Sequence, residues 1–470
     1  MTIASFPFLA FVAIAALLHA VAPGARVKQL AMVAVNLGFL STFATAPAAY
    51  VPLFGFLAVS YGGLWLLPAT RSRPVRLAII GAVLVGFFWL KRYSFLPSAT
   101  FLPFAYTTIG LSYIFFRVMH LLIDASSEGG EPKRIGAMVF TNYTLNFTTL
   151  VSGPIQLFHD FAAPPSPFGW ADFGIAIERI ALGFFKVIVL AAILNAIHLD
   201  GLAALPAAET LNQRVQAALL LSVGYTFYLY CNFSGYTDIV IGAARLFGQR
   251  LPENFNYPFS APSFMIFWQR WHMTLTEWLK TYVYNPFVIA LMTFFPARPL
   301  QEAHGILAFF VTFFLIGLWH GQTPVFALYG VLLGLGVSLN KLHQLAMTKW
   351  LGRRGYRSVA ETWWYRTVAR GITFTWFTLS LFCFWGTWSD IVLVVGNLGW
   401  AGSAAFVVTL IALASPVLAA AEALRERLGG LPVLESRYTR TVWTTMLAAI
   451  AVSALAIMAS PAPDIVYKTF

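Results

Sequence analysis

Long apolar runs follow one another along most of the chain and are separated by short polar segments. A helix needs roughly 20 residues to cross about 30 Å of hydrocarbon. The pattern predicts spans at 3–21, 29–46, 48–67, 76–91, 101–123 and 135–153. It predicts more spans at 173–199, 214–233, 305–321, 324–340, 371–390, 402–421 and 441–459, with partial or surface helices in 234–300. We therefore expect an all-α, polytopic integral membrane protein of about 11 to 13 transmembrane or re-entrant helices.

Composition and charge restrict the class of protein further. Of the 470 residues, 59% are hydrophobic and only 10% are charged, whereas a soluble domain is about 25% charged. A mean hydropathy of +0.74 therefore excludes a soluble globular enzyme. The net charge is +12, but the basic residues cluster in short loops, where membrane topology and anionic lipid account for them. We expect no nucleic-acid partner.

The basic clusters predict how the chain is oriented. They lie at Arg26 and Lys28, Arg71 to Arg76, Lys133 and Arg134, 349–370 and 425–440. Placing all of them in the cytoplasm gives a consistent alternation at both ends, with both termini outside. Lys91 and Arg92 fall on the wrong side in this scheme. Residues 3–21 follow no charged n-region, which predicts a first spanning helix and not a cleaved signal peptide, and 1–470 is expected to be one integral domain.

Polar side chains inside apolar runs are functional candidates, because they are costly within a membrane. In 224–248, Asn232, Ser234 and Asp238 interrupt such a run. A break in the helix is tolerated at membrane depth where its backbone is buried in protein or lines a wet cavity. A turn at the membrane surface explains the same composition equally well.

A second polar group lies in 251–287. Pro262 suits the first turn of a helix, and large apolar residues recur after it at helical steps, among them Trp268 and Trp271. The polar residues on or beside the other face are Gln269, Arg270, His272, Thr276 and Lys280. The pattern predicts one amphipathic helix, which either anchors the chain in the interface, with His272 at its border, or walls a polar cavity.

A third polar group interrupts the nearly apolar segment 305–336 at Trp319 and His320. Pro324 lacks a backbone N–H, so a helix break is expected beside His320. This break is either a plain turn at the surface or a place where two helices meet inside the membrane and direct their polar ends at a cavity.

A fourth group, Arg117, His120 and Asp124, recurs at near-helical steps. His120 and Asp124 stand four residues apart, so they are expected to pair on one helix face, and a structural role is the favoured interpretation. Arg117 is the candidate here for lining a passage.

Motifs of other enzyme classes are missing from the sequence. There is no G-x-S-x-G elbow, no G-x-x-x-x-G-K-[ST] phosphate loop and no H-E-x-x-H. Cys231 and Cys383 lie inside apolar runs without the spacing of a metal site, and no dense acidic cluster suits Mg²⁺. We expect no metal and no permanently bound cofactor, so the histidines remain as candidate bases.

Four segments then appear in a recognisable order: FSGYTDIVIGAARLFG, LPENFNYPF, FWQRWHMTLTEWLKTYVYNPF and IGLWHGQTPVFALYG. The sequence resembles the bacterial membrane-bound O-acyltransferases, close to the branch with the alginate O-acetyltransferase membrane subunit and the D-alanyl transfer protein of teichoic acid. The resemblance covers about residues 100–390, leaving 1–99 and 391–470 as flanking helices. It implies helices around a central cavity and a multi-pass protein of the inner (cytoplasmic) membrane.

The resemblance also implies roles for single residues. His320 matches the family's defining intramembrane histidine, and His272 matches the second histidine, in the R-W-H segment. We expect His320 to be the general base and His272 to orient the acceptor, hold the oxyanion or relay the proton. The expected substrate-binding residues are Trp319, Arg270, Trp271, Gln269, Trp268, Asn232 and Asp238. Asn232 departs from the F-D-F-S-G-Y-S-D pattern that is usual in this branch, so any mechanism that needs a carboxylate there is in doubt.

Histidine suits acyl transfer from a thioester to an alcohol, because the hydroxyl proton must be removed near neutral pH as the C–O bond forms. The leaving thiolate, whose parent thiol has a pKa near 8.5, needs little acid help. The resemblance implies a cytoplasmic thioester donor, either acetyl-CoA or an acyl-carrier protein, and an extracytoplasmic acceptor or partner acyltransferase protein, in contact with membrane lipids. Acetyl is the expected acyl group and D-alanyl the alternative.

Two rival classes remain to be weighed. A small-molecule transporter also places polar breaks at mid-membrane, but it should show paired half-helices in two repeats, and the sequence shows none. A lipid-linked glycosyltransferase needs acidic catalytic or metal-binding residues, and carboxylates within the apolar runs are sparse. The acyltransferase interpretation is therefore favoured.

Overall fold

The computed structural model describes residues 1–470 except 71, 127–134, 165–167, 430, 432, 434–435 and 458–470. The described residues form helices, turns and loops, and their only strand-like pairing is an isolated bridge between Phe255 and Trp271. Eight of the described helices are long and apolar enough to cross a membrane. The expected all-helical, polytopic architecture is confirmed. Of the basic residues used above for orientation, Arg71, Lys133 and Arg134 lie outside the described residues.

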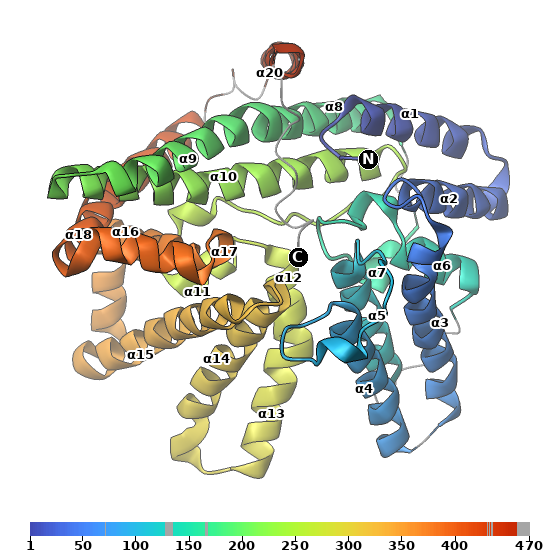
Figure 1. The fold of residues 1–470 in the computed structure, drawn as a ribbon, viewed down its shortest axis with the longest axis horizontal. Coiled ribbons are helices and arrows are strands. Elements are labelled where there is room, and N and C mark those ends of the chain that lie inside the picture. The colour runs from blue at the N-terminus through green and yellow to red at the C-terminus, as the bar shows by residue number, and fades with distance from the viewer. Residues whose placement is uncertain are drawn as a thin grey trace. The chain divides into compact units, whose positions relative to one another are not determined.

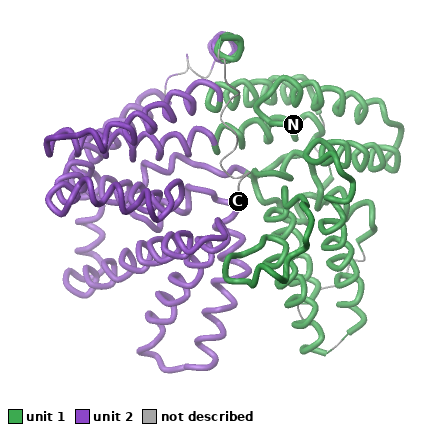
Figure 2. Tube along the Cα trace, viewed as in Figure 1, with its two compact units in different colours: residues 1–187, 233–252, 451–470 green, residues 188–232, 253–450 purple. Residues whose placement is uncertain are grey.

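The chain forms two compact units, shown in different colours in Figure 2. Unit 1 comprises residues 1–187, 233–252 and 451–470, and unit 2 comprises residues 188–232 and 253–450. His272 and His320 both belong to unit 2. The candidate active site can therefore be described within that unit alone.

Unit 1 contains the N-terminal helices and the second half of α10 (Figure 1). Its helices are α1 (Phe6–Val21), α2 (Gly24–Leu40), α3 (Val51–Leu66), α4 (Arg73–Leu90), α5 (Leu111–Ser126), α6 (Ala137–Thr144), α7 (Phe158–Phe161) and α8 (Trp170–Phe185). Short 3-10 turns occur at Pro47–Tyr50, Leu67–Ala69, Ser98–Thr100 and Phe147–Thr149. The first four helices follow the spans that the apolar runs predict.

Two other expected spans of unit 1 are wrong in extent. The helix expected over 101–123 begins only at Leu111, and the span expected over 135–153 is reduced to the eight-residue α6. Arg117 of α5 explains the early end of α6. Its buried guanidinium donates hydrogen bonds to the carbonyl oxygens of Thr144 at 2.9 Å and Thr149 at 2.8 Å, so this backbone is satisfied without helical pairing.

The two cations that conflict with the expected orientation are held by local structure in unit 1. Lys91 is only 2% exposed, and burial lowers the pKa of its ammonium group to about 8. Arg92 has a φ of 55°, and its guanidinium donates to the carbonyl oxygens of Leu102 and Phe104. Cations that are buried or bound to carbonyl groups in this way are poor markers of the side of the membrane on which a loop lies.

Unit 2 contains the first half of α10 (Leu211–Arg245) and most of the chain after it. Its other helices are α9 (Ala191–Ala207), α11 (Phe264–Trp268), α12 (Met273–Leu279), α13 (Asn285–Phe294), α14 (Gln301–His320), α15 (Pro324–Ala360), α16 (Trp363–Ser380), α17 (Phe382–Trp385), α18 (Trp388–Leu428) and most of α20 (Arg437–Ile457). π-Helical turns at Lys186–Leu190 and Lys280–Tyr284 precede α9 and α13, and 3-10 turns lie at Pro258–Ser260 and Arg298–Leu300.

Helix α10 is continuous, so both interpretations of a break within 224–248 are wrong. The hydroxyl of Thr226 donates to the carbonyl oxygen of Ser222 at 2.8 Å, and the hydroxyl of Thr237 donates to that of Phe233 at 2.9 Å. Hydroxyl groups that bond back to a carbonyl four residues earlier are accommodated inside a helix. The polar composition of this segment therefore requires no loop.

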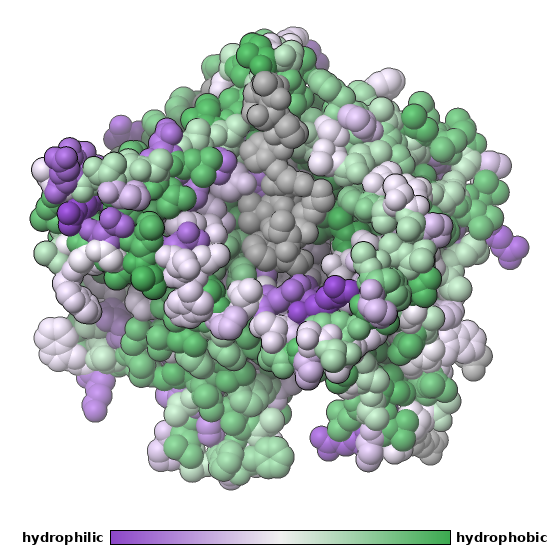
Figure 3. All heavy atoms as spheres, in the orientation of Figure 1, coloured by the Kyte–Doolittle hydropathy of each residue, from purple (hydrophilic) through white to green (hydrophobic). Residues whose placement is uncertain are grey.

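Helices α14 and α15 pack closely against each other in unit 2. A Cβ atom on Gly317 would lie 2.2 Å from the Cα atom of Gly330, so this approach requires glycine. Helix α13 joins α14 in a hairpin whose outer surface in Figure 3 is largely hydrophobic. Ile289 and Phe294 on this hairpin are 63% and 77% exposed, as suits side chains that face lipid.

Candidate active site

His272 lies in a tight turn between α11 and α12, so the expectation of one continuous amphipathic helix is wrong. Its backbone is left-handed, with φ 46° and ψ 51°. The segment that begins at Asn254 forms backbone hydrogen bonds with the residues on both sides of this turn. The N–H of Asn256 donates to the carbonyl oxygen of Arg270 at 2.9 Å, and the N–H of Met273 donates to that of Asn254 at 2.9 Å. These backbone groups pair between segments and are not available to continue α11 into α12.

The contact between Asn254 and His272 determines the tautomer of the imidazole. Oδ1 of Asn254 accepts hydrogen bonds from the backbone N–H of Thr274 at 3.3 Å and from its hydroxyl at 2.8 Å. A backbone N–H can only donate, so this amide atom is the oxygen. Nδ1 of His272 lies 3.2 Å from the same oxygen and must therefore donate to it. The neutral ring then carries its proton on Nδ1 and its lone pair on Nε2.

Burial keeps this imidazole neutral. His272 is 1% exposed, and the loss of hydration on burial lowers the pKa of its side chain to about 3. Over the ordinary working range of pH the ring is therefore uncharged. A neutral imidazole with its lone pair on Nε2 accepts a hydrogen bond there and does not donate one.

His320 is the last residue of α14 and is 3% exposed. The expected helix break beside it is confirmed, because α15 starts at Pro324. Aromatic rings surround the imidazole: the centroids of Tyr329 and Phe384 lie 5.7 Å and 5.0 Å from that of His320. The break therefore holds the histidine in the protein interior and does not expose it on a surface turn.

The ring of Trp319 lies near the rings of both histidines. Its ring centroid is 4.7 Å from that of His320 and 6.4 Å from that of His272. Two segments that are far apart in the sequence thus place their imidazoles against one indole. This arrangement brings together the residues that the sequence singles out as catalytic, together with Trp319 from the expected substrate-binding set.

Trp268 and Trp271 are buried in an aromatic cluster beside this site. The ring centroid of Trp271 lies 5.7 Å from that of Phe267, on which it stacks, and 4.9 Å from that of Phe377. The ring centroids of Trp268 and Phe313 are 5.0 Å apart. These contacts give both residues a packing role. Among the residues that the structure describes, Nε1 of Trp268 is buried without a hydrogen-bond partner, so this N–H group is an unused donor.

Arg270 belongs to a group of arginines at Ser260, and its neighbour Gln269 is exposed. The Arg270 guanidinium donates to the hydroxyl of Ser260, and Nε of Arg370 donates to the Ser260 carbonyl oxygen at 3.0 Å. Arg370 also forms an ion pair with Glu422. Burial lowers the pKa of Arg270, and the charges of neighbouring arginines lower it further. The positive charge at this group suits the anionic part of a bound molecule.

Asn232 and Asp238 lie on the same helix, α10, but in different units. Asn232 is fully buried in unit 2. The carboxylate of Asp238 in unit 1 forms ion pairs with Arg179 at 2.8 Å and Lys186 at 2.7 Å. The two ion pairs give Asp238 a structural role within unit 1, and its expected part in substrate binding stays a prediction.

The pairing of His120 with Asp124 is confirmed, with Nδ1 of the ring 3.0 Å from the carboxylate. The backbone N–H of Phe158 donates to Nε2 of His120 at 3.1 Å, which leaves the ring proton on Nδ1, facing Asp124. Both ring nitrogens therefore have protein partners. The favoured structural interpretation of this group agrees with its geometry.

Asn254 is a residue of the site that sequence reasoning missed. It lies inside the segment LPENFNYPF, which contributes to the resemblance to the membrane-bound O-acyltransferases. Among the described residues its Nδ2 atom is buried without a hydrogen-bond partner, although its Oδ1 accepts from His272 and Thr274. Tyr329 and Phe384, which enclose His320, were also missed, because an aromatic residue in an apolar run carries no local signal of its role.

No set of three or more His, Cys, Asp or Glu side chains within the described residues is placed to hold a metal ion. The site itself offers two imidazole groups and buried N–H donors. Nε2 of His272 accepts, whereas Nε1 of Trp268 and Nδ2 of Asn254 donate. Such a set can remove a proton from a hydroxyl group and stabilise charge on an oxygen.

Comparison with known proteins identifies a matching family and several relatives. The model of the membrane-bound O-acyltransferase family, MBOAT, matches residues 73–384. "Teichoic acid D-alanyltransferase" of Bacillus subtilis is 28% identical over 290 residues, which cover 59% of this chain and 68% of that protein. "Probable alginate O-acetylase AlgI" of Pseudomonas fluorescens is 29% identical over 302 residues, which cover 61% of this chain and 56% of that protein. "Peptidoglycan O-acetyltransferase" of Helicobacter pylori is 29% identical over 208 residues, or 43% and 37%.

Proposed function

The chain belongs to the membrane-bound O-acyltransferase family, and from that premise we propose that it moves an acetyl group from a cytoplasmic thioester to an extracytoplasmic hydroxyl group. It is an integral, multi-pass membrane acyltransferase. The acceptor in this proposal is a cell-envelope polysaccharide or a partner protein, and the membrane is the inner membrane. Relatives named as O-acetylases of alginate and of peptidoglycan support acetyl.

The observation that carries the proposal is the pair of buried histidines against Trp319. His320 is the general base that takes the proton from the acceptor hydroxyl. The hydroxyl oxygen attacks the thioester carbonyl carbon, and the C–S bond breaks to release a thiolate. The proton taken by His320 then passes to that thiolate or to water, which returns the imidazole to its neutral form. General-base catalysis of this kind contributes about 10²- to 10⁴-fold.

The tautomer of His272 argues against one of the three roles expected for this residue. Of the three roles expected for it, holding the oxyanion requires a donor, and Nε2 of the neutral ring is an acceptor. His272 therefore orients the acceptor by accepting a hydrogen bond from its hydroxyl group, or relays the hydroxyl proton. The buried donors Nε1 of Trp268 and Nδ2 of Asn254 are better suited to the developing negative charge.

The donor in this proposal is a thioester of coenzyme A or of an acyl-carrier protein, used as a substrate and not as a bound cofactor. Arg270 and its neighbouring arginines provide positive charge for the phosphate that both donors carry. The relative named as a teichoic acid D-alanyltransferase supports D-alanyl as the alternative acyl group.

The test is to compare cells without the gene with cells complemented by the wild type or by His320→Ala. Acetate and D-alanine are released from the isolated envelope by mild base and quantified. We expect base-labile acetate to disappear in the deletion strain and in His320→Ala, and to return with the wild type. Loss of D-alanine instead would support the alternative, and unchanged levels of both would overturn the proposal. A transporter would leave the transported molecule unesterified.

A further inference from the structure

Unit 2 contains a cavity of about 710 Å³, which the proposed chemistry does not use. It lies between α11, α15 and α16, and none of its lining residues is among the candidate catalytic or substrate-binding residues. Its volume is within the range of about 300–1,000 Å³ that is typical of small-molecule sites. Its wall is largely apolar and includes Phe264, Leu339, Ile372 and Trp376.

The polar part of this cavity is formed by the bend in α15. Gly352 has a φ of 72°, so the helix changes direction there, and the part after the bend carries Tyr356 back toward His343. The ring centroids of His343 and Tyr356 are 6.3 Å apart, and those of His343 and Tyr365 are 6.4 Å apart. His343 and Gln344 thus place polar groups on the wall of an otherwise apolar and aromatic cavity.

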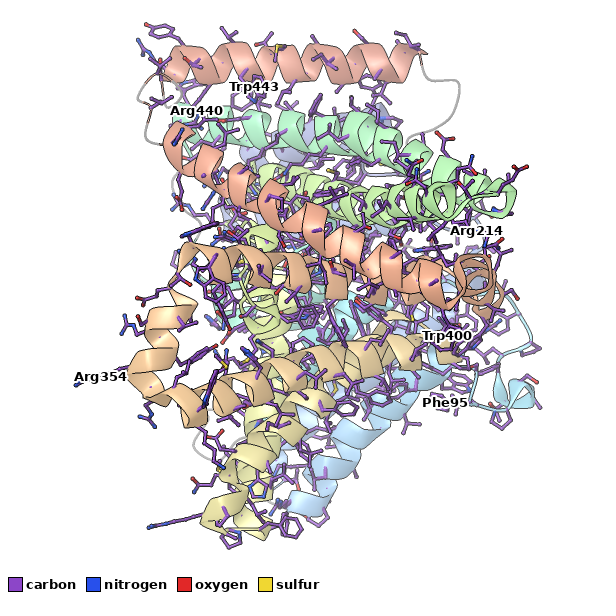
Figure 4. All side chains as sticks on the ribbon, turned by 90° about the vertical axis from the view of Figure 1, so that its left-hand side faces the viewer. Phe95, Arg214, Arg354, Trp400, Arg440 and Trp443 are labelled. Carbon is purple, nitrogen blue, oxygen red and sulfur yellow. The ribbon has the colours of Figure 1, made fainter. Side chains whose placement is uncertain are left out.

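Uncompensated positive charge lies on the helical bend beside the cavity. Lys349, Arg353 and Arg354 are exposed, and no ion pair to any of them occurs among the described residues. In Figure 4 Arg354 points outward from the bend of α15. Trp350 and Trp363, at the same bend and at the start of α16, are each 78% exposed. Exposed tryptophan beside arginine and lysine is typical of the membrane interface on the cytoplasmic side.

We propose that this cavity binds an anionic phospholipid of the cytoplasmic leaflet. An acyl chain of the lipid occupies the apolar wall, its glycerol group lies at His343, and its phosphate lies outside the cavity at the basic bend with Arg353 and Arg354. A free phosphate would leave the apolar wall unused, and a lipid without net charge would leave the basic residues uncompensated. A lipid with a net negative headgroup satisfies both parts, and such lipids are enriched in that leaflet.

The test titrates the purified full-length protein with phosphatidylglycerol and with phosphatidylcholine of the same chain length, and counts bound lipids by native mass spectrometry. We expect one phosphatidylglycerol to bind at a concentration about tenfold lower than phosphatidylcholine. Arg353→Gln with Arg354→Gln should remove that preference while phosphatidylcholine binding stays unchanged. Ala369→Trp, which fills the cavity, should weaken the binding of both lipids.

Matched controls separate this site from a general effect of charge or size. Arg437→Gln with Arg440→Gln removes the same charge from α20, which does not line the cavity, and Val408→Trp adds bulk at an exposed position of α18. Both should bind phosphatidylglycerol as the wild type does. Equal loss in a control variant, or no preference in the wild type, would overturn the proposal. So would displacement of the lipid by glycerol phosphate alone, since the apolar wall would then be irrelevant.

Discussion

Nδ1 of His272 lies 3.2 Å from Oδ1 of Asn254, an oxygen that already accepts two hydrogen bonds from Thr274. Because this contact assigns the ring proton to Nδ1, the lone pair is on Nε2, and Nε2 is the hydrogen-bond acceptor of the neutral ring. The contact also distinguishes the two histidines of the site. The ring of His320 is packed between the aromatic side chains of Tyr329 and Phe384, whereas the ring of His272 is oriented by Asn254.

The first prediction concerns the base. His320→Ala should lower the rate of acyl transfer by about 10²- to 10⁴-fold without loss of membrane insertion, because the variant removes proton abstraction and leaves the fold intact. The rate is measured in purified membranes with labelled acetyl thioester. His198→Gln is the matched control, since His198 is also a buried, ring-packed histidine of unit 2 and should retain activity. Equal losses in both variants would assign the effect to folding.

The second prediction separates orientation from proton relay at His272. A glutamine or asparagine side chain retains an acceptor but no titrating ring, so His272→Gln should leave measurable activity if the residue orients the hydroxyl group. His272→Asn is the better-tolerated variant, because asparagine adopts the left-handed backbone of this position more readily. Activity is compared with that of His320→Ala under the same conditions. Complete loss in both His272 variants, with normal folding, would favour the relay.

The third prediction uses the pKa of His272, which burial lowers to about 3. At neutral pH the ring of His272 is therefore uncharged, and its titration should not contribute to the pH–rate profile of the wild type. The part of the profile that reports the general base, His320, should persist in His272→Gln. Asn254→Asp places a carboxylate beside the ring and favours the imidazolium, which raises the pKa. Because the imidazolium cannot accept at Nε2, activity in this variant should fall as the pH is lowered. An unchanged profile would contradict the tautomer assignment.

The sequence was sufficient for most of the long helices and for singling out the two histidines as candidates, whose catalytic roles stay predictions. An apolar run of helical length has few alternatives in a membrane, and a polar residue within such a run is conspicuous. The break at His320 was predictable for the same reason, since Pro324 follows it closely.

Other features depend on contacts between distant segments. Asn254 pairs with the segment of His272, and no spacing rule predicts that the two meet. Arg117 takes up carbonyl groups that would otherwise continue α6. Asp238 was a reasonable site candidate from its place on α10, but its cationic partners Arg179 and Lys186 lie on or beside another helix.

The fourth prediction tests orientation. The segment 349–370, which includes the end of α15 and the start of α16, contains six basic residues, of which only Arg370 is buried, and it should lie in the cytoplasm because positive charge is costly to translocate. Ser358 is exposed near the end of α15, so Ser358→Cys in a background without Cys231 and Cys383 provides a single reporter thiol. It should resist an impermeant thiol reagent in intact cells and react in inverted membrane vesicles. Labelling in intact cells would reverse the assigned topology.

The last prediction concerns Asn232, which stands where this branch of the family usually has aspartate. The side chain is fully buried, so Asn232→Asp introduces a carboxylate into the protein interior. Burial of a charge is costly or raises the pKa of the group until it is neutral, and a neutral carboxylic acid has one O–H donor where the amide has two N–H donors. We expect activity to fall by at least about tenfold, since a cost of ~1.4 kcal/mol corresponds to that factor.

The measurement for Asn232→Asp is the transfer rate at equal amounts of folded protein, with thermal stability recorded in parallel. Asp238→Asn is the matched control with the opposite change on the same helix, where it removes a carboxylate held by Arg179 and Lys186. That control should lose stability, because two cations are left without their partner, and its activity per folded molecule should change less. Full activity and stability in Asn232→Asp would mean that water or a cation reaches position 232, and that the family's usual aspartate remains compatible with this site.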